Sequence, residues 1–172
     1  NMNVFIRKIK HMKYFTIKEL CYSDTAKLHK IDNTPSEEII ENLTEFTEKV
    51  LDPLREAWGS AIKVNSGYRC EKLNKKVGGS KTSSHKKGFA VDLKPVNGLI
   101  DEFFEFVKKY FMENKIPFDQ IIDEHSGNKH WVHIGYKNSK GEQRKQIKLY
   151  DNGKYYLLKY NNDEKEELKN EN

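Results

Sequence analysis

Cysteine is scarce in this sequence, with only two residues among 172. Cys21 and Cys70 are far apart in the chain and form no Cys-x-x-Cys motif, so we expect two free and partly buried thiols. A globular chain of this length buries roughly 70% of its unfolded surface, so it needs no disulfide scaffold. The length suits a single domain.

Long hydrophobic runs are also absent. No segment approaches the roughly 20 apolar residues of a membrane-spanning helix, so we expect no membrane span. The first residues, NMNVFIRKIKHMKYF, are basic but lack the apolar core and the small-residue cleavage site of a secretory signal. We therefore expect no signal peptide and synthesis in the cytoplasm.

The charge balance is basic, because 31 Lys and Arg residues stand against 26 Asp and Glu residues and give a net charge of +5. Such a charge fits a polyanionic partner, either nucleic acid or an anionic cell wall, and it equally fits a lysine-rich solvated surface. The lysines are scattered rather than clustered, and no aromatic-basic motif is present. This pattern argues against a nucleic-acid partner.

Two segments carry apolar residues at helical spacing and predict the main helices. The first begins at Thr34-Pro35-Ser36-Glu37, which forms a capping box with proline at the first helical position, and it ends at Trp58-Gly59. Pro53 lies inside this helix and should kink or split it. The second helix covers about residues 99–113. Residues 14–33 should contain one or two helical turns.

The later part of the chain predicts strands. Asn152-Gly153 is a typical hairpin turn, and a polar loop covers residues 71–88. Helices first and antiparallel strands later favour a single α+β domain over residues 1–160, followed by an acidic, disordered tail over residues 161–172. The expected strands are residues 61–66, 90–94, 118–123, 131–136, 146–150 and 155–160.

An aspartate interrupts an apolar strand in the stretch SSHKKGFAVDL, residues 83–93. Asp92 follows Phe89-Ala90-Val91 and precedes Leu93. A buried ionised carboxylate costs several kcal/mol unless it is paired or binds a metal. Taken alone, Asp92 could equally pair with a lysine or cap a turn.

Two histidines suggest the metal alternative. His85 lies on the polar loop just upstream of Asp92, and His133 lies in the apolar segment HWVHIGY, where it alternates with Trp131 and Gly135 on one face. Two histidines and an aspartate, with water in the fourth position, make an open tetrahedral zinc site. We therefore hypothesise that His85, Asp92 and His133 bind Zn²⁺.

The stretch SGYRCEKLNKKVGGSKTSSHKKGFAVDL resembles the signature of the zinc D-Ala-D-Ala peptidases of the M15 class, and more closely the branch found in bacteriophage and prophage lysis proteins. FDQIIDE, WVHIGY and the segment that begins YFTIKELCYS are similar to the same branch, so the resemblance covers residues 14–137. The pattern S-x-H-x-x-G-x-A-x-D runs from Ser83 to Asp92. The resemblance implies the Hedgehog/DD-peptidase fold, an α+β antiparallel sheet packed with two main helices, and zinc bound by His85, Asp92 and His133.

The resemblance also implies substrate-binding residues. The family uses an arginine in the SGYR strand to hold a substrate carboxylate or carbonyl, and this position is Arg69. The planar guanidinium can bind a carboxylate through two hydrogen bonds, although a structural ion pair is the alternative for Arg69. Ser83 either contacts the substrate beside the zinc histidine or is a plain loop residue. Trp131 either lines the substrate groove or belongs to the core.

The general base is a choice between Glu124 and His130. Some branches of the class carry an acid three positions before the last zinc histidine, where this chain has His130. In the phage-like branch a glutamate ends the FDQ-I-I-x-E strand, and this position is Glu124. We favour Glu124, because His130 and His133 fall on opposite faces of a regular strand. A structural role is expected for the neighbouring polar residues Asp119, Gln120 and Asp123.

The predicted function is zinc-dependent hydrolysis of an amide bond in peptidoglycan peptides, by a carboxypeptidase or an endopeptidase. We expect a monomer that acts at the bacterial cell wall after release through another factor's pore or delivery in a virion. The alternative is a non-catalytic, zinc-containing cell-wall binding module, because the same fold occurs in Hedgehog signalling domains. The presence of Arg69, Ser83 and Glu124 together favours catalysis.

Overall fold

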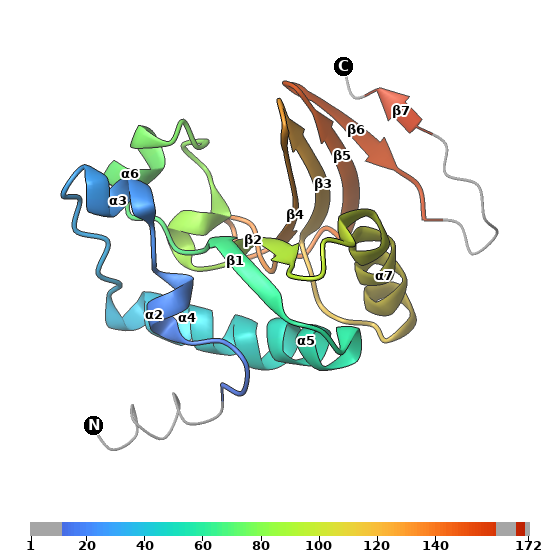
Figure 1. The fold of residues 1–172 in the computed structure, drawn as a ribbon, viewed down its shortest axis with the longest axis horizontal. Helices are drawn as coiled ribbons and strands as arrows, with labels where there is room; N and C mark the ends of the chain where they lie inside the picture. The colour runs from blue at the N-terminus through green and yellow to red at the C-terminus, as the bar shows by residue number, and fades with distance from the viewer. Residues whose placement is uncertain (1–11, 161–167, 171–172) are drawn as a thin grey trace.

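The computed structural model describes residues 12–160 and 168–170. Seven strands form one sheet in the order β1-β2-β4-β3-β5-β6-β7 (Figure 1). Neighbouring strands pair antiparallel, except β3 and β5, which pair parallel. The α+β prediction is confirmed, with this one parallel pair as a departure from it. The strands are β1 (Ile62–Ser66), β2 (Ala90–Pro95), β3 (Gln120–Ser126), β4 (Lys129–Gly135), β5 (Gln146–Asp151), β6 (Lys154–Leu158) and β7 (Leu168–Asn170).

The predicted first helix is present and runs from Glu37 to Trp58. It consists of α4 (Glu37–Phe46), the π-helical turn η1 (Thr47–Leu51) and α5 (Asp52–Trp58). Pro53 follows the π-helical turn, so the helix changes its hydrogen-bond register there and continues instead of breaking. Gly59 ends the helix in the left-handed conformation, with φ of 74°.

The helix starts later than its capping motif predicts. Ser36, rather than Thr34, is the N-cap, and its hydroxyl accepts a hydrogen bond from the backbone N–H of Ile39. The reason is that Ser36 keeps an extended backbone, so Pro35 lies before the helix and does not occupy its first turn. The segment upstream contains α2 (Ile17–Leu20) and α3 (Asp24–Leu28), which confirms the short helical turns expected there.

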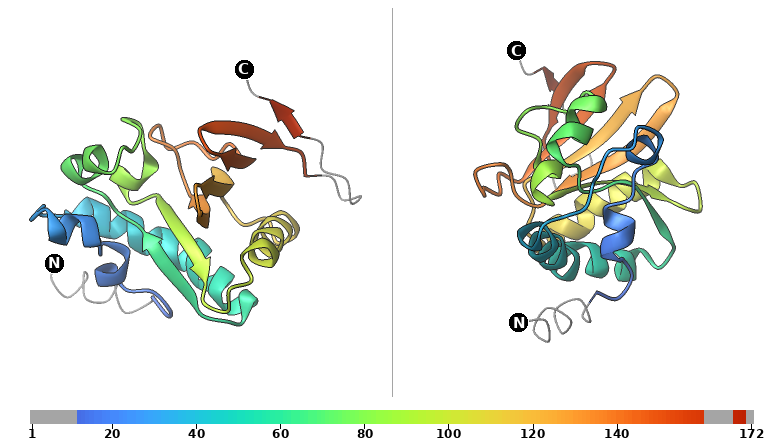
Figure 2. Two further views of the ribbon diagram at one scale, coloured as in Figure 1. Left: turned by 45° about the horizontal axis from the view of Figure 1, so that its top comes forward. Right: turned by 90° about the vertical axis from the view of Figure 1, so that its left-hand side faces the viewer.

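The helices bury their apolar stripes against one face of the sheet. The helix α7 (Ile100–Glu113) packs on β2, β3 and β4, and α5 packs beside it (Figure 2). Burial of one large apolar side chain stabilises the fold by about 1.5–3 kcal/mol. No helix in the described part of the chain is long and apolar enough to cross a membrane. The core includes Leu43, Phe46, Val50, Leu54, Val91, Leu93, Phe103, Val107, Phe111, Ile121, Val132 and Ile134.

The segment 71–88 is more ordered than the polar loop that its composition predicts. It contains the helix α6 (Glu71–Lys76) and the 3₁₀ turn η2 (Ser84–Lys87). Leu73 is fully buried against Ala26 and Ile31, and this contact holds α6 on α3. The buried amide of Asn74 donates a hydrogen bond to the carbonyl of Ser80 and closes the loop that follows.

The hairpin predicted at Asn152-Gly153 is confirmed, because both residues have positive φ and join β5 to β6. The tail predicted at residues 161–172 lies outside the described residues, apart from Leu168–Asn170. These three residues form β7 and pair with β6, where the composition indicated no regular structure. The two cysteines, Cys21 and Cys70, are free and partly buried, as expected.

Strand β3 covers Gln120–Ser126 and not residues 118–123. Asp119 lies in a bend just before the strand, where its carboxylate accepts hydrogen bonds from the Arg144 side chain at 2.8 Å. The strand extends further at its other end because it pairs with β4 all the way to the hairpin turn. Glu124 therefore lies inside a regular strand.

Close approach of two backbone segments requires glycine at position 67. A Cβ atom added to Gly67 would lie 2.1 Å from the carbonyl oxygen of Leu20, which is a backbone atom and cannot rotate away. The Leu20 carbonyl also accepts a hydrogen bond from the N–H of Tyr68, at 2.7 Å, so the two segments are held together here.

Gly67→Ala is therefore expected to lower the free energy of unfolding by about 1–3 kcal/mol, the usual cost of forcing extra atoms into a packed site. Urea denaturation followed by circular dichroism measures this change. Gly135→Ala is the matched control, because its added Cβ would make only ordinary contacts, the nearest at 3.6 Å. Equal midpoints for the two variants would contradict the proposed steric conflict.

Candidate metal centre

The pairing of β2 with β4 places Asp92 directly opposite His133. Side chains of directly opposite residues point to the same face of a sheet, here the face that the helices leave open. The Oδ1 atom of Asp92 lies 2.9 Å from Nδ1 of His133. Both side chains are largely buried, with about one-eighth of each exposed to solvent.

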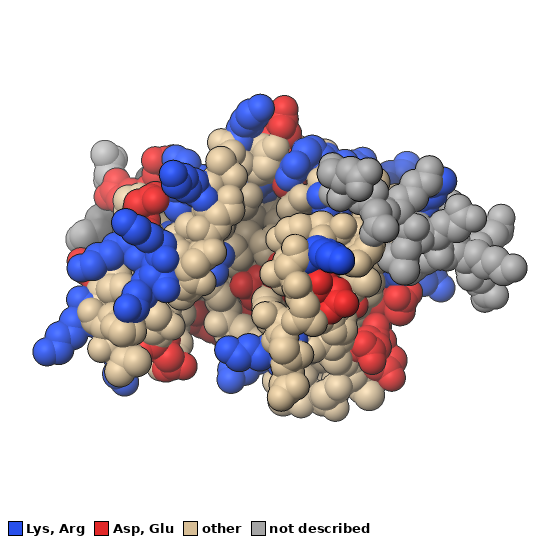
Figure 3. Space-filling view, turned by 90° about the horizontal axis from the view of Figure 1, so that it is seen from above, with Lys and Arg blue, Asp and Glu red and all other residues tan. Residues whose placement is uncertain are grey.

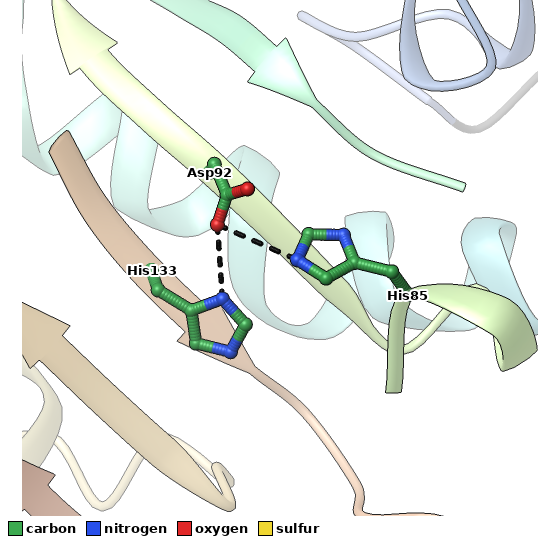
Figure 4. A group of neighbouring side chains, drawn as sticks. All are labelled: His85, Asp92 and His133. Carbon is green, nitrogen blue, oxygen red and sulfur yellow. Dashed lines mark hydrogen bonds and ion pairs between the residues drawn. The ribbon is translucent and has the colours of Figure 1, made fainter. Parts of the chain in front are cut away.

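His85 reaches the same carboxylate from the turn η2, and its side chain is buried. Its Nδ1 donates a hydrogen bond of 2.7 Å to the carbonyl of Gly67, which leaves a lone pair on Nε2. This Nε2 atom lies 3.4 Å from Oδ1 of Asp92 (Figure 4). Gly88 ends the turn with φ of 71° and allows the chain to pass from η2 into β2.

The electrostatics of this group suit a divalent cation. Burial alone would raise the pKa of Asp92, but the neighbouring imidazoles of His85 and His133 outweigh it and hold that pKa below its ordinary value. Burial lowers the pKa of His85, which favours the neutral imidazole that a metal ligand needs. The centre therefore combines a buried anion with at least one neutral nitrogen donor, which are ligands that zinc prefers.

The geometry also fits. The three candidate ligand atoms lie within 4.8 Å of one another. Two ligands on a tetrahedral zinc ion with bonds of about 2.0–2.1 Å are about 3.3 Å apart, close to the separations of 2.9 Å and 3.4 Å seen here. The structure thus brings together His85, Asp92 and His133, the three residues for which the sequence predicts metal binding.

Glu124 lies beside this centre on the same face of the sheet. It follows Ile122 by two positions on β3, and Ile122 is the direct partner of His133. The Oε1 atom of Glu124 lies 3.9 Å from Nδ1 of His133. Burial raises the pKa of Glu124 to about 7. A carboxyl group with a pKa near neutrality can both accept and return a proton.

His130 does not join the centre, although it was the second candidate for the general base. It pairs with His125 across the hairpin, and its Nε2 lies 2.5 Å from Oδ1 of Asp123. His130 and His133 are three positions apart, an odd number, so their side chains leave β4 on opposite faces. Of the two candidates, the structure therefore places only Glu124 next to the three metal-ligand candidates.

Arg69 and Ser83 lie at the edge of the same centre. A terminal nitrogen of Arg69 donates a long hydrogen bond of 3.5 Å to the hydroxyl of Ser83. The buried Nε of Arg69 has no hydrogen-bond partner among the described residues. Burial lowers the pKa of this guanidinium, and the charges of Asp92 and Glu124 oppose that shift. A buried N–H group of this kind can donate a hydrogen bond to an anionic or carbonyl oxygen of a ligand.

One open cleft of about 710 Å³ is lined by the metal-ligand candidates and by Arg69, Ser83 and Glu124. One wall comes from the loop around η2 and includes Ser83, and the other comes from β3, β4, β5 and β6 (Figure 3). Trp131, directly opposite Glu124, lies in this second wall rather than in the core. Most of the residues that line the cleft are polar, which suits a peptide ligand with amide and carboxylate groups.

Tyr150 and Tyr155 also line the cleft and were not predicted as site residues. Their ring centroids are 4.8 Å apart across the β5–β6 hairpin. Tyr150 pairs with Glu124 through the parallel contact between β3 and β5. The hairpin turn at Asn152-Gly153 indicates from the sequence that Tyr150 and Tyr155 lie near one another. No local sequence pattern indicates that β5 pairs with β3, which is what brings both tyrosines to the cleft.

A comparison with protein families finds that the Peptidase M15 family matches residues 13–135. No curated protein matches the chain. The matched region contains Arg69, Ser83, Glu124 and all three metal-ligand candidates, and it ends before β5. The match covers well over half of the sequence, and the chain therefore belongs to the Peptidase M15 family.

Proposed function

We propose that this peptidase is zinc-dependent and hydrolyses an amide bond in the peptide part of peptidoglycan. The observation that carries the proposal is the convergence of His85, Asp92, His133 and Glu124 on one face of the cleft. Membership of the M15 family supports both the metal and the substrate class. The net charge of +5 supports action at an anionic cell wall.

Zinc would be held by Nε2 of His85, Oδ1 of Asp92 and Nδ1 of His133. When bound, zinc supplies a Lewis acid that polarises the scissile carbonyl and increases the acidity of water. The hydrogen bond from His85 to the carbonyl of Gly67 fixes the orientation of that imidazole. The protein therefore presents these ligand atoms in a preorganised form.

Glu124 acts as the general base in this proposal. Its carboxylate accepts a proton from the attacking water and then donates it to the nitrogen of the departing amine. The position of Glu124 on a regular strand, opposite Trp131, fixes the direction of its carboxylate toward the cleft. Glu124 is not a proposed metal ligand, so its role can be separated experimentally from metal binding.

Arg69 holds the substrate in this proposal. Its side chain is mostly buried and lines the cleft, so the guanidinium is fixed next to the metal centre. A planar guanidinium can bind a carboxylate or a carbonyl through two parallel hydrogen bonds. Ser83, which accepts a hydrogen bond from Arg69, positions that side chain and is itself open to the substrate.

We further propose that the protein acts as a monomer without nucleic acid. It would be made in the cytoplasm and reach the wall through a pore or a virion, as in phage lysis. The cleft opens to the surface (Figure 3), and in this proposal it accepts a cross-linked wall peptide as well as a free chain end. Mass spectrometry of the new termini in digested peptidoglycan identifies the bond that is cut.

Asp92→Ala is expected to lower the zinc content by about one equivalent per chain relative to the natural protein, because Asp92 is the only anionic ligand of the proposed set. Zinc is measured by mass spectrometry of the metal after dialysis. Asp52→Ala is a control that removes a buried aspartate that does not line the cleft. Equal zinc in Asp92→Ala and the natural protein would remove Asp92 from the site.

Arg69→Lys should reduce peptidoglycan hydrolysis while leaving the zinc content and the melting temperature nearly unchanged. Lysine keeps the positive charge but loses the two-pronged geometry of the guanidinium. Release of new termini from purified peptidoglycan measures the effect. A variant with full turnover would show that Arg69 serves the structure and does not hold the substrate.

Glu124→Gln should lower the rate of hydrolysis by about 10²–10⁴-fold, the typical loss when a general base is removed. Glutamine keeps the size of the side chain and removes its basicity, so zinc content and wall binding should persist. Glu142→Gln is the matched control, and it should leave the rate unchanged. Glu142 lines the same cleft, but its carboxylate accepts a hydrogen bond from the side chain of Asn138.

Two results would overturn this assignment. Unchanged turnover in Glu124→Gln would remove Glu124 from the role of base. A zinc-loaded natural protein that binds several types of peptidoglycan, yet releases no new termini from them, would be a binding module and not an enzyme.

A further inference from the structure

A second cluster of potential metal ligands lies on the opposite face of the β3–β4 hairpin. Asp123 and His125 alternate with Glu124 along β3, so their side chains leave the strand on the other side. His130 is the direct partner of His125 on β4. Sheet register therefore gathers Asp123, His125 and His130 on the face that also carries the core, away from the cleft.

The donor atoms of this cluster converge on one carboxylate. Nε2 of His125 lies 2.9 Å from Oδ2 of Asp123, and Nε2 of His130 lies 2.5 Å from Oδ1. The two imidazole rings are stacked, with centroids 3.8 Å apart and planes 27° apart. The three donor atoms lie within 4.8 Å of one another, as do those of the candidate metal centre.

The three side chains are partly exposed, His125 most of all at 36%. An ion could reach them from solvent, and water could complete its coordination.

We propose that Asp123, His125 and His130 form a second zinc site, separate from the cleft and independent of the proposed function. Two imidazole nitrogens and a carboxylate oxygen suit zinc among the available divalent ions. The ion would join β3 to β4 across the hairpin that also carries Glu124 and His133. Its role would be structural, because it would hold together the two strands that carry Glu124 and His133.

His130 also lies near the helix α7. Nδ1 of His130, the nitrogen that faces away from Asp123, lies 3.9 Å from the carboxylate of Asp101 in the first turn of that helix. This separation is longer than a hydrogen bond. A zinc ion on Nε2 of His130 would nevertheless increase the electrostatic attraction between this ring and the Asp101 carboxylate.

The test uses the full chain with Asp92→Ala as the background, so that zinc binding in the cleft is already reduced. Calorimetric titration with zinc alone should show about one remaining equivalent per chain, and zinc should raise the melting temperature. Adding His130→Ala should abolish both effects. Adding His29→Ala, which removes an exposed histidine at the end of α3, should leave both unchanged.

Asp123→Asn in the same background is the second variant, because asparagine keeps the shape of the side chain and removes its charge. It should weaken zinc binding at least 10-fold while the zinc-free melting temperature stays close to that of the background. If zinc binding and the zinc-induced stabilisation persist in both His130→Ala and Asp123→Asn, the cluster is a hydrogen-bonded network and the proposal is wrong. Absence of zinc binding in the Asp92→Ala background would also overturn it.

The second site is tested by zinc stoichiometry and melting temperature, whereas the proposed function is tested by peptidoglycan hydrolysis. Either proposal can therefore be contradicted without the other. Loss of peptidoglycan hydrolysis in Glu124→Gln says nothing about this site. A zinc-binding hairpin in a protein with no hydrolytic activity would support the second site and contradict the proposed function.

Discussion

The negative charge of Asp92, buried within the sheet, determines how the site is arranged. An ionised carboxylate buried without compensation would cost several kcal/mol. Here His133 on the neighbouring strand and His85 on the turn η2 surround the carboxylate. The backbone supports this arrangement, because Gly67 accepts the hydrogen bond that orients His85 and Gly88 allows the turn before β2.

The period of two along a strand separates the functions of the β3–β4 hairpin. On the open face, Glu124, Trp131 and His133 meet the cleft. On the reverse face, Asp123, His125 and His130 form a group that contacts the start of α7 through His130. A shift of one residue in the register would exchange the two sets, so correct pairing of the hairpin is a condition for both.

The sequence predicts the elements whose signals are local. Helical spacing predicts the helix from Glu37 to Trp58 and α7, and the spacing of His85, Asp92 and His133 predicts the metal-ligand candidates. The choice between Glu124 and His130 also follows from strand alternation, because a regular β4 cannot point both His130 and His133 at one ion.

Features that depend on distant contacts could not be predicted. The helix α6 forms in a lysine-rich segment because Leu73 finds a pocket against α3, and composition alone does not show that pocket. Tyr150 and Tyr155 reach the cleft only because β5 pairs parallel to β3, and no turn or spacing rule specifies that partner. The pairing of β7 with β6 is a long-range contact of the same kind.

Anomalous X-ray diffraction at the zinc absorption edge, from crystals of the zinc-loaded protein, locates the metal among its ligands. We expect a strong anomalous peak within about 2.0–2.2 Å of Nε2 of His85, Oδ1 of Asp92 and Nδ1 of His133. Glu124 should lie outside the coordination sphere. A fully loaded crystal with no peak among these three atoms, or with Glu124 as a ligand in place of Asp92, would show that the metal site is assigned wrongly.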